Sequence, residues 1–249
     1  ESIKGLISMQ QIWKMSNDEV SQSIDYLNYV EDQTPTKLQD LVDAIPIAGV
    51  QVAQLGGTLQ DTTVLLTAFR EKGIATVEGA NGIKTAMNRI LSPTRGARDT
   101  FQELTGKSLP GLVKATQGKP LETFQALSDT IMGGNIALAD QQRIISKLVG
   151  TYQSSRITAL LSGLQTKGGA VEEAMNISSQ NPEQWAAKTA KSLSAITSSA
   201  SGQFKIAMES FKAELLPVGD IVLKVVTAIV KGATGIFKLF NGLPDFVKW

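Results

Sequence analysis

The chain has 249 residues, of which 42% are hydrophobic and 19% charged, and its formal net charge is only +1. This length is sufficient for a packed core, and the near-neutral charge gives no overall basicity that would favour a nucleic-acid-binding protein. The chain contains neither cysteine nor histidine, which excludes disulfides and thiolate metal sites and removes the commonest general base. These two absences disfavour an enzyme.

The first helices are indicated by hydrophobic spacing and by end signals. Residues 2–15 place apolar side chains near helical spacing, and Ser16 with Glu19 three residues later forms the pattern of a capping box. Thr34-Pro35 is expected to open the next helix, with proline at the first helical position. Pro46 is expected to interrupt that helix and to kink it before it resumes.

The following helix is delimited by a polar start and a glycine end. Either Thr58 or Asp61 is expected to cap its first turn. Gly73 suits the left-handed C′ position at its end, and Thr76 then begins the next helix.

The central stretch Gly79–Gly106 predicts two amphipathic helices. The apolar residues of its first half recur at i, i+4, i+7 and i+8, which is the spacing of one helix face. Ser92 is expected to cap the second helix, with Pro93 at its first position, and Gly106 is expected to end it. Nothing in this stretch is typical of catalysis, and we expect it to fix a corner between two packed helices.

The remaining segments also follow the 3.6-residue period, and no run of alternating β-branched residues is present. Helices are expected at 121–131, 135–149, 151–164, in a short segment ending near Ile177, from Asn181-Pro182 to Pro217, and at 221–240. The predicted fold class is all-α, a multi-helix array of short antiparallel helices followed by a long helix and a C-terminal apolar helix. We divide the chain into an N-terminal helical segment (1–57), a helical core domain (58–180) and the long helix with the C-terminal amphipathic helix (181–249).

The charge is distributed unevenly along the chain. Residues 1–50 carry 3 basic and 8 acidic side chains, residues 51–202 carry 15 and 11, and residues 203–249 carry 6 and 4. The resulting net charges of −5, +4 and +2 indicate different neighbours for the two ends of the chain.

Three patterns resemble functional motifs without meeting their requirements. Gly106-Lys107-Ser108 resembles the end of a phosphate-binding loop, but Phe101 stands where the first glycine is needed. Gly79-Ala80-Asn81-Gly82 lacks the third glycine of a dinucleotide fingerprint, and we attribute its glycines to close helix packing. The neighbouring carboxylates of Glu31-Asp32 and Glu172-Glu173 do not face each other on a helix. We therefore predict no catalytic residue, no cofactor, no metal site and no small-molecule substrate.

The C-terminal apolar helix carries a stripe of three lysines. Lys224, Lys231 and Lys238 repeat every seven residues, and no acidic residue lies between Asp220 and Asp245. Each lysine would cost about 2.5–3.5 kcal/mol at the centre of a bilayer, so we do not expect a stable membrane span. Two alternatives stay open. The helix packs against partner helices with its lysines outside, which we favour, or it enters a membrane interface as an amphipathic helix.

Several different short sequence motifs lie at predicted helix ends and on predicted helix faces over residues 20–220. In chain order these motifs are Gly73-Ile74, Gly82-Ile83-Lys84, Leu91-Ser92-Pro93-Thr94, Leu104-Thr105-Gly106, Gly118-Lys119, Leu127, Leu148-Val149-Gly150, Leu160-Leu161, Trp185, Leu193 and Leu215-Leu216-Pro217. Their order resembles the core region of phage tail tape-measure proteins. One departure is Met132-Gly133-Gly134, which stands where relatives often carry an aromatic step.

The resemblance implies a structural virion protein without enzymatic activity. A tape-measure protein lies in the lumen of the tail tube, sets the length at which tube polymerisation stops, and is expelled ahead of the genome. The implied partners are further copies of itself in threefold or sixfold symmetry, tail-tube and tail-tip proteins and, in some phages, the end of the genomic DNA and the host membrane. Such proteins are usually much longer and Glu1 is not methionine, so we expect a processed or partial piece.

The alternative function is a membrane-active helical protein that acts through its C-terminal amphipathic helix. A cell-wall hydrolase, which some tape-measure proteins carry elsewhere in their length, is rejected for this chain. It offers neither histidine nor cysteine, and no spaced pair of carboxylates in a credible cleft.

Overall fold

The computed structural model describes the backbone of residues 2–200 and the side chains of residues 5–192. Over this range the chain forms twelve α-helices and no strand, which confirms the predicted all-α class. The helices are α1 (Ser2–Trp13), α2 (Asn17–Gln33), α3 (Leu38–Gln54), α4 (Leu59–Glu71), α5 (Thr76–Leu91), α6 (Arg95–Thr105), α7 (Leu109–Ala115), α8 (Pro120–Ile131), α9 (Leu138–Val149), α10 (Thr151–Leu164), α11 (Ala170–Ser178) and α12 (Pro182–Ala200). The predicted helix at 221–240 lies outside the described residues.

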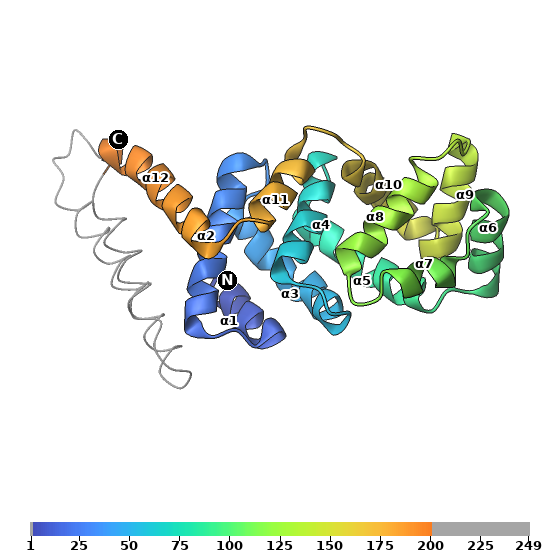
Figure 1. Ribbon diagram of the computed structural model, residues 1–249, viewed down its shortest axis with the longest axis horizontal. Helices are drawn as coiled ribbons and strands as arrows, with labels where there is room; N and C mark the ends of the chain where they lie inside the picture. Colours follow the sequence, from blue (N-terminus) through green and yellow to red (C-terminus); the bar gives the residue numbers. More distant parts are fainter. Residues whose placement is uncertain (1, 201–249) are drawn as a thin grey trace.

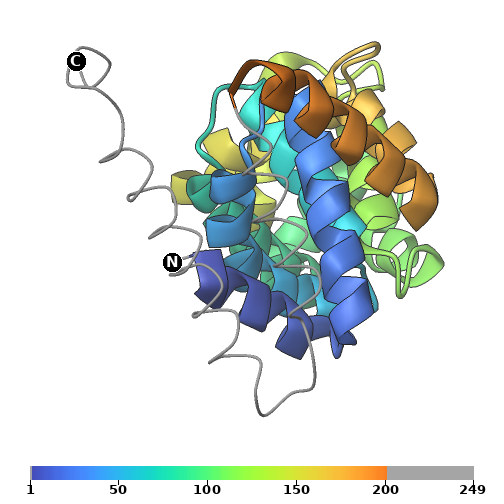
Figure 2. The ribbon, with the colours of Figure 1, turned by 90° about the vertical axis from the view of Figure 1, so that its left-hand side faces the viewer.

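The helices form an elongated array through which the chain runs out and returns (Figure 1). Helices α1, α2 and α3 lie toward one end, whereas α6, α7 and α9 lie at the other. Helices α10 and α11 then lead back, so that α12 packs against α2, as the end-on view in Figure 2 shows. The first and the last described helices therefore share one end of the array.

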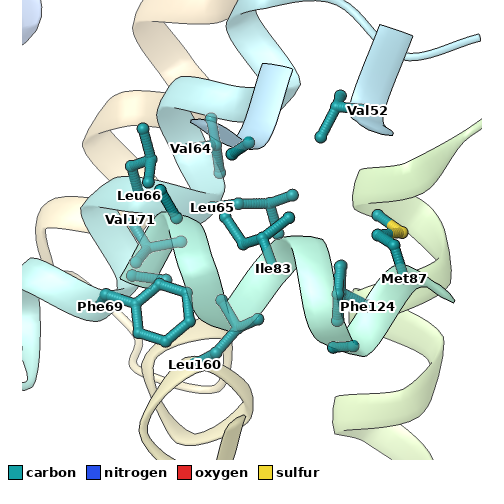
Figure 3. Packing of buried hydrophobic residues seen from close by; sticks show 14 of the residues in the cluster. Val52, Val64, Leu65, Leu66, Phe69, Ile83, Met87, Phe124, Leu160 and Val171 are labelled. Atoms are coloured by element: carbon teal, nitrogen blue, oxygen red, sulfur yellow. The ribbon is translucent and has the colours of Figure 1, made fainter. Parts of the chain in front are cut away.

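Helix α4 lies at the centre of the core. It contacts α3, α5, α8, α10 and α11, and every residue from Thr62 to Phe69 is buried. Phe69 has no exposed surface and lies beside Leu160 and Val171 (Figure 3). Threonine is tolerated here because its hydroxyl bonds to the carbonyl one turn earlier, as Thr63 Oγ1 does to the Leu59 oxygen at 3.0 Å.

A single buried cluster connects all parts of the array. It extends from Met9 in α1 through α4 to Trp185 in α12. It therefore includes residues from each of the three predicted divisions, and the division at 57/58 and 180/181 stays a prediction.

The predicted end signals of several helices are confirmed. Ser16 with Glu19 and Thr58 with Asp61 each form a complete capping box, in which side chain and backbone bond reciprocally. Gly73 has φ +77° after α4 and Gly106 has φ +70° after α6, so both adopt the left-handed conformation that favours glycine.

Two predictions based on prolines at the start of the chain are wrong. Pro35 does not open a helix, because Thr34 and Lys37 on either side have extended backbone angles and α3 begins only at Leu38. The extended segment carries the buried Thr36, whose hydroxyl donates to Thr67 Oγ1 at 3.4 Å. Pro46 does not interrupt α3, which is continuous from Leu38 to Gln54. Packing of α3 against α1, α4 and α5 outweighs the hydrogen bond that proline removes.

The predicted start of α6 is also wrong by two residues. Ser92 is the C-cap of α5, and Thr94 is the N-cap of α6, because Thr94 Oγ1 accepts a hydrogen bond from the Ala97 amide at 3.2 Å. Pro93 thus precedes the cap, where its ring still prevents α5 from continuing. The predicted corner exists, with Thr94 rather than Ser92 as its cap.

Candidate interaction surfaces

The first pair of motif residues closes α4. Gly73 and Ile74 donate backbone hydrogen bonds to the carbonyls of Arg70 and Phe69, both at 3.0 Å. This is the double hydrogen bond of a Schellman motif, which satisfies carbonyls at the end of a helix. Ile74 also packs against the core cluster. Both residues therefore connect α4 to α5 and offer no free binding group.

The second pair lies where α5 faces α10. Ile83 is fully buried, and the position of a Cβ added at Gly82 would lie 3.4 Å from Phe69 Cζ and 3.7 Å from Arg156 Cβ. Three motif residues, Pro93, Thr94 and Gly106, frame α6 at the far end of the array. The structure thus separates these two groups, and it places neither in a common site.

Trp185 anchors α12 to the body of the array. Its Nε1 donates to the Ile177 carbonyl at 2.8 Å, and its ring centroid lies 5.1 Å from that of Tyr26 in α2. One turn later, Thr189 Oγ1 donates to the Asp25 carbonyl at 3.0 Å. Burial raises the pKa of the Tyr26 phenol, so this contact stays uncharged. Pro217, the last motif residue, lies outside the described residues.

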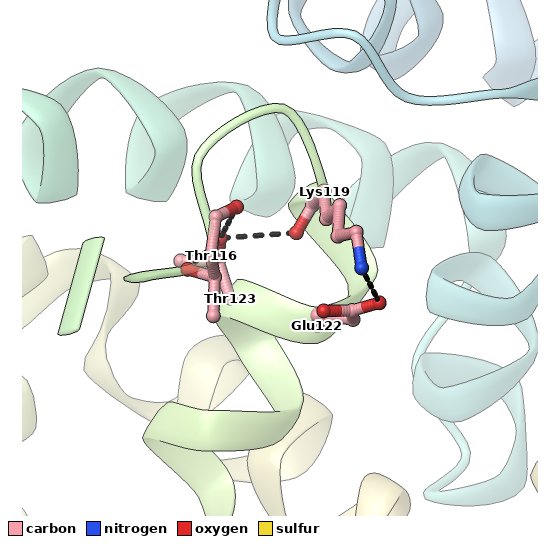
Figure 4. Close-up of polar contacts among 4 residues, drawn as sticks. All are labelled: Thr116, Lys119, Glu122 and Thr123. Carbon is pink, nitrogen blue, oxygen red and sulfur yellow. Dashed lines mark hydrogen bonds and ion pairs between the residues drawn. The ribbon is translucent and has the colours of Figure 1, made fainter. Parts of the chain in front are cut away.

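A junction that the sequence did not reveal lies between two glycine turns. Gly56 (φ +83°) and Gly118 (φ +82°) meet backbone to backbone, since a Cβ at Gly56 would lie 2.9 Å from the Gly118 carbonyl oxygen. The turn around Gly118 is held by the hydroxyls of Thr116 and Thr123, 2.8 Å apart (Figure 4). The junction packs the α3–α4 turn onto the α7–α8 turn.

The most exposed large apolar side chain in residues 5–192 is Tyr152, at 81%. Its ring lies 5.1 Å from the guanidinium carbon of Arg156, one turn further along α10. Arg156 Nε and Nη2 both reach Glu78 Oε1 of α5, at 2.7 and 2.6 Å, and its Nη1 donates to Gln153 Oε1 at 3.0 Å. The hydrogen bond to Glu78 raises the pKa of Arg156, which keeps the guanidinium charged. We call Tyr152 with Arg156 and Glu78 the tyrosine knob.

Three cations without an ion-pair partner among residues 5–192 lie on α5 and α9, two helices that pack against α10. An atom of the Arg89 guanidinium lies 2.9 Å from the position of a Cβ added at Gly150, the residue between α9 and α10. Lys84 is exposed on α5 and Lys147 on the last turn of α9, and none of the three forms an ion pair among residues 5–192. The helices from α5 to α10 (76–164) carry 10 basic and 6 acidic side chains.

An acidic hollow of about 500 Å³ lies between the end of α2 and the start of α11. No cationic side chain lines it. Its lining residues are Gln33, Pro35, Gly168, Gly169, Ala170, Glu172, Glu173 and Asn176. The surrounding helices, in residues 5–75 and 165–192, carry 7 basic and 12 acidic side chains, so this part of the array is net negative where the α5–α10 part is net positive.

The patterns that suggested ligand chemistry acquire structural explanations. Lys107 Nζ donates to Thr130 Oγ1 at 3.2 Å, and Gly106-Lys107-Ser108 is a helix end followed by the N-cap of α7. Glu172 accepts a hydrogen bond from the Gly168 amide at the start of its own helix. Within the described part of the chain, no group of three or more acidic side chains has the geometry of a metal site. None of its helices combines the length and hydropathy of a membrane span.

No periodic or capping pattern in the sequence indicates the knob or the hollow. The one signal available for the knob, which our sequence-based predictions did not use, is an aromatic residue placed among polar ones in Thr151-Tyr152-Gln153-Ser154-Ser155.

Comparison with known proteins identifies a family. A family model described as phage-related minor tail protein matches residues 1–150. The matched range extends from α1 through α9 and contains the motif residues from Gly73 to Gly106. Neither the curated proteins nor the solved structures contain a match to this chain.

Proposed function

This chain belongs to the family of phage-related minor tail proteins, since the family model covers more than half of its length, and from this premise we propose that it is a segment of a tape-measure protein. Family membership makes it a structural protein of a phage tail and a component of the virion. In the proposed role it sets tail length during tube assembly, inside the tail tube or at the tail tip, and is released at DNA ejection.

The observation that carries the proposal is the family match together with the positions of the motif residues. Gly73, Ile74, Gly82, Ile83, Pro93, Thr94 and Gly106 all lie within the matched range. Each of them ends, caps or packs a helix, as expected of residues that maintain an architecture. A structural role without catalysis accords with this, and the chain lacks histidine and cysteine throughout.

The shape of the array suggests how such a segment would be used. One continuous helix over residues 2–200 would span about 300 Å at about 1.5 Å per residue. The described residues instead run out and return, so their first and last helices share one end (Figure 1). We propose that this part is a folded module of the length-setting polypeptide, held by tail-tip and tube proteins and by copies of itself in threefold or sixfold symmetry. In this proposal, its contacts at ejection are with the DNA end and the host membrane.

The proposal is tested in phage that carry a variant with a destabilised core. Phe69→Ala should cost about 3–5 kcal/mol, because Phe69 is fully buried at the centre of the array. Electron microscopy should then show missing tails or tubes of widely distributed length. Leu138→Ala changes a side chain that is 72% exposed and should leave tails uniform. Uniform tails of normal length in a Phe69→Ala phage whose chain is unfolded would refute length control.

The lysine stripe at Lys224, Lys231 and Lys238 lies outside the described residues. We retain the proposal that this segment contacts partner helices, and a membrane interface is the alternative that would make the protein membrane-active. Leakage of dye from anionic vesicles distinguishes them. Leakage that disappears when the three lysines are replaced by glutamine would favour the membrane, whereas no leakage would favour partner helices.

A further inference from the structure

We propose that the tyrosine knob of one copy docks in the acidic hollow of a second copy, so that copies of this chain associate head to tail. The inference deepens the proposed self-association of the protein by naming the two surfaces involved. It concerns the purified chain in solution and therefore does not depend on whether the protein sets tail length.

The knob is both exposed and ordered before any partner binds. Tyr152 projects from α10 with 81% of its surface exposed, yet its ring rests near a guanidinium that cannot move freely. Arg156 is fixed by Glu78 of a different helix and by Gln153, with contacts of 2.6–3.0 Å. Tyrosine and arginine are enriched among residues that dominate interface energetics, and a side chain held before binding loses little entropy on docking.

The hollow has the volume for an aromatic side chain, and its charge is opposite to that of Arg89 beside the knob. A volume of about 500 Å³ falls within the range of pockets that accept whole ligands, so an aromatic side chain fits. Pro35 and Ala170 provide apolar contact, while Glu172 and Glu173 provide negative charge. Docking would bring these carboxylates toward Arg89, whose guanidinium lies beside Gly150 at the start of α10 and which has no ion-pair partner among residues 5–192. Such complementarity steers association and fixes its register.

The pairing has to occur between different copies and between different faces. Helix α10 separates Tyr152 from the turn that leads to the hollow by about 20 Å, given its rise of about 1.5 Å per residue. If two copies met knob to knob in a symmetric dimer, the Arg89 side chains of both copies would face each other, and their repulsion would disfavour that dimer. A knob-to-hollow contact is heterologous, and contacts of this type build rings or filaments rather than twofold dimers.

Sedimentation velocity of the full chain tests the proposal. In about 50 mM salt, protein at about 100 μM should associate, and about 500 mM salt should weaken the association because it screens the charges. Tyr152→Ala should weaken it about thirtyfold. Leu138→Ala, which removes another exposed apolar side chain, is the matched control and should not change it.

A second pair of variants tests the hollow. Asn176 is exposed, so Asn176→Arg places a cationic side chain in the hollow without removing a buried contact, and it should abolish association. Gln102→Arg, at an exposed position of α6, is its control. An equimolar mixture of Tyr152→Ala and Asn176→Arg retains one intact knob and one intact hollow, so it should form heterodimers and nothing larger.

The outcomes separate this inference from tail-length control. A wild-type chain that stays monomeric, a Tyr152→Ala chain that associates like Leu138→Ala, or a mixture that fails to form heterodimers would each overturn head-to-tail docking. Recovery in the mixture also demonstrates that both variants are folded. Tail length in particles is a separate measurement, and neither result determines the other.

Discussion

Replacing Gly79 or Gly82 by alanine provides a test of the packing at the centre of the array. Both glycines lie in α5, three residues apart, and both face Phe69 of α4. The added methyl group would lie 2.6 Å from Phe69 Cγ at position 79, but 3.4 Å from Phe69 Cζ at position 82. Only the first distance is a clash, and it involves Cγ and Cβ of the fully buried Phe69, which lie next to the backbone and cannot swing away.

The difference between the two variants follows from these distances. Alanine is favoured over glycine within a helix by about 0.8–1 kcal/mol, and both variants gain this amount. Overpacking at position 79 should cost about 1–3 kcal/mol, whereas position 82 accepts the methyl group at ordinary contact distance. Gly82→Ala should therefore be more stable than the parent chain, and Gly79→Ala should be less stable than Gly82→Ala by about 1–3 kcal/mol.

Urea unfolding followed by far-ultraviolet circular dichroism measures this difference. The midpoints should differ while the slopes agree, because the area exposed on unfolding is nearly the same. In thermal unfolding, each kcal/mol should shift Tm by about 2–4 °C for a chain of this size. If Gly79→Ala were as stable as Gly82→Ala, the close contact of α5 with Phe69 would not exist and the packing described for α4 would be incorrect.

Three further predictions concern anchors and helix ends. Trp185→Ala should lower the free energy of unfolding by about 3–5 kcal/mol. Because Trp185 joins α12 to α2 and α11, amide hydrogen exchange should accelerate more in α12 than in α5. Equal acceleration in both helices would contradict a local anchor. Thr58→Ala removes a capping box and should destabilise the chain by about 1 kcal/mol. Ala75 is the N-cap of α5 but makes no side-chain hydrogen bond, so Ala75→Asp should stabilise the chain by a similar amount. The unfolding midpoints of the two variants should therefore move in opposite directions. Hydrogen bonding with the Ser16 backbone and hydroxyl lowers the pKa of Glu19 in the folded chain below its ordinary value of 4.5. The ionised carboxylate should therefore stabilise the fold above pH 4.5, and this contribution should be lost as the pH falls through the lower pKa of the folded chain. The difference in unfolding free energy between the parent chain and Glu19→Gln should shrink over the same pH range.

Sequence reasoning succeeded where a local signal determines local structure. The capping boxes at Ser16 and Thr58 and the left-handed glycines at 73 and 106 were predictable, because their hydrogen bonds close within a few residues. The all-α class followed from the 3.6-residue period for the same reason.

Prolines were misjudged because tertiary contacts decide their effect. Pro46 lies inside α3, which is continuous and packs against α1, α4 and α5. Pro35 lies in the segment before α3, from which the Thr36 hydroxyl bonds to Thr67 of α4. Likewise, we predicted from the sequence that Gly79 and Gly82 both allow two helices to pack closely. In the structure, only a side chain at position 79 would clash with Phe69. Local propensity cannot contain such information.

The candidate surfaces were least predictable. Tyr152, Glu78 and Glu172 come from segments far apart in the chain, and no periodic pattern connects them. The knob depends on an ion pair between α5 and α10, and the hollow depends on α11 returning beside α2. Both arise from the return path of the chain, which sequence patterns did not reveal.

Tail length in particles with insertions at two positions tests the central claim most directly. A helical insertion of about 21 residues after Ala200 should lengthen tails by about 32 Å, because each helical residue adds about 1.5 Å. The same insertion in the exposed turn between Gly134 and Asn135 leaves the ends of the array in place and should leave tail length unchanged. A tape-measure segment predicts this contrast in electron micrographs. Tails of unchanged length in both phages, with both proteins incorporated, would contradict it.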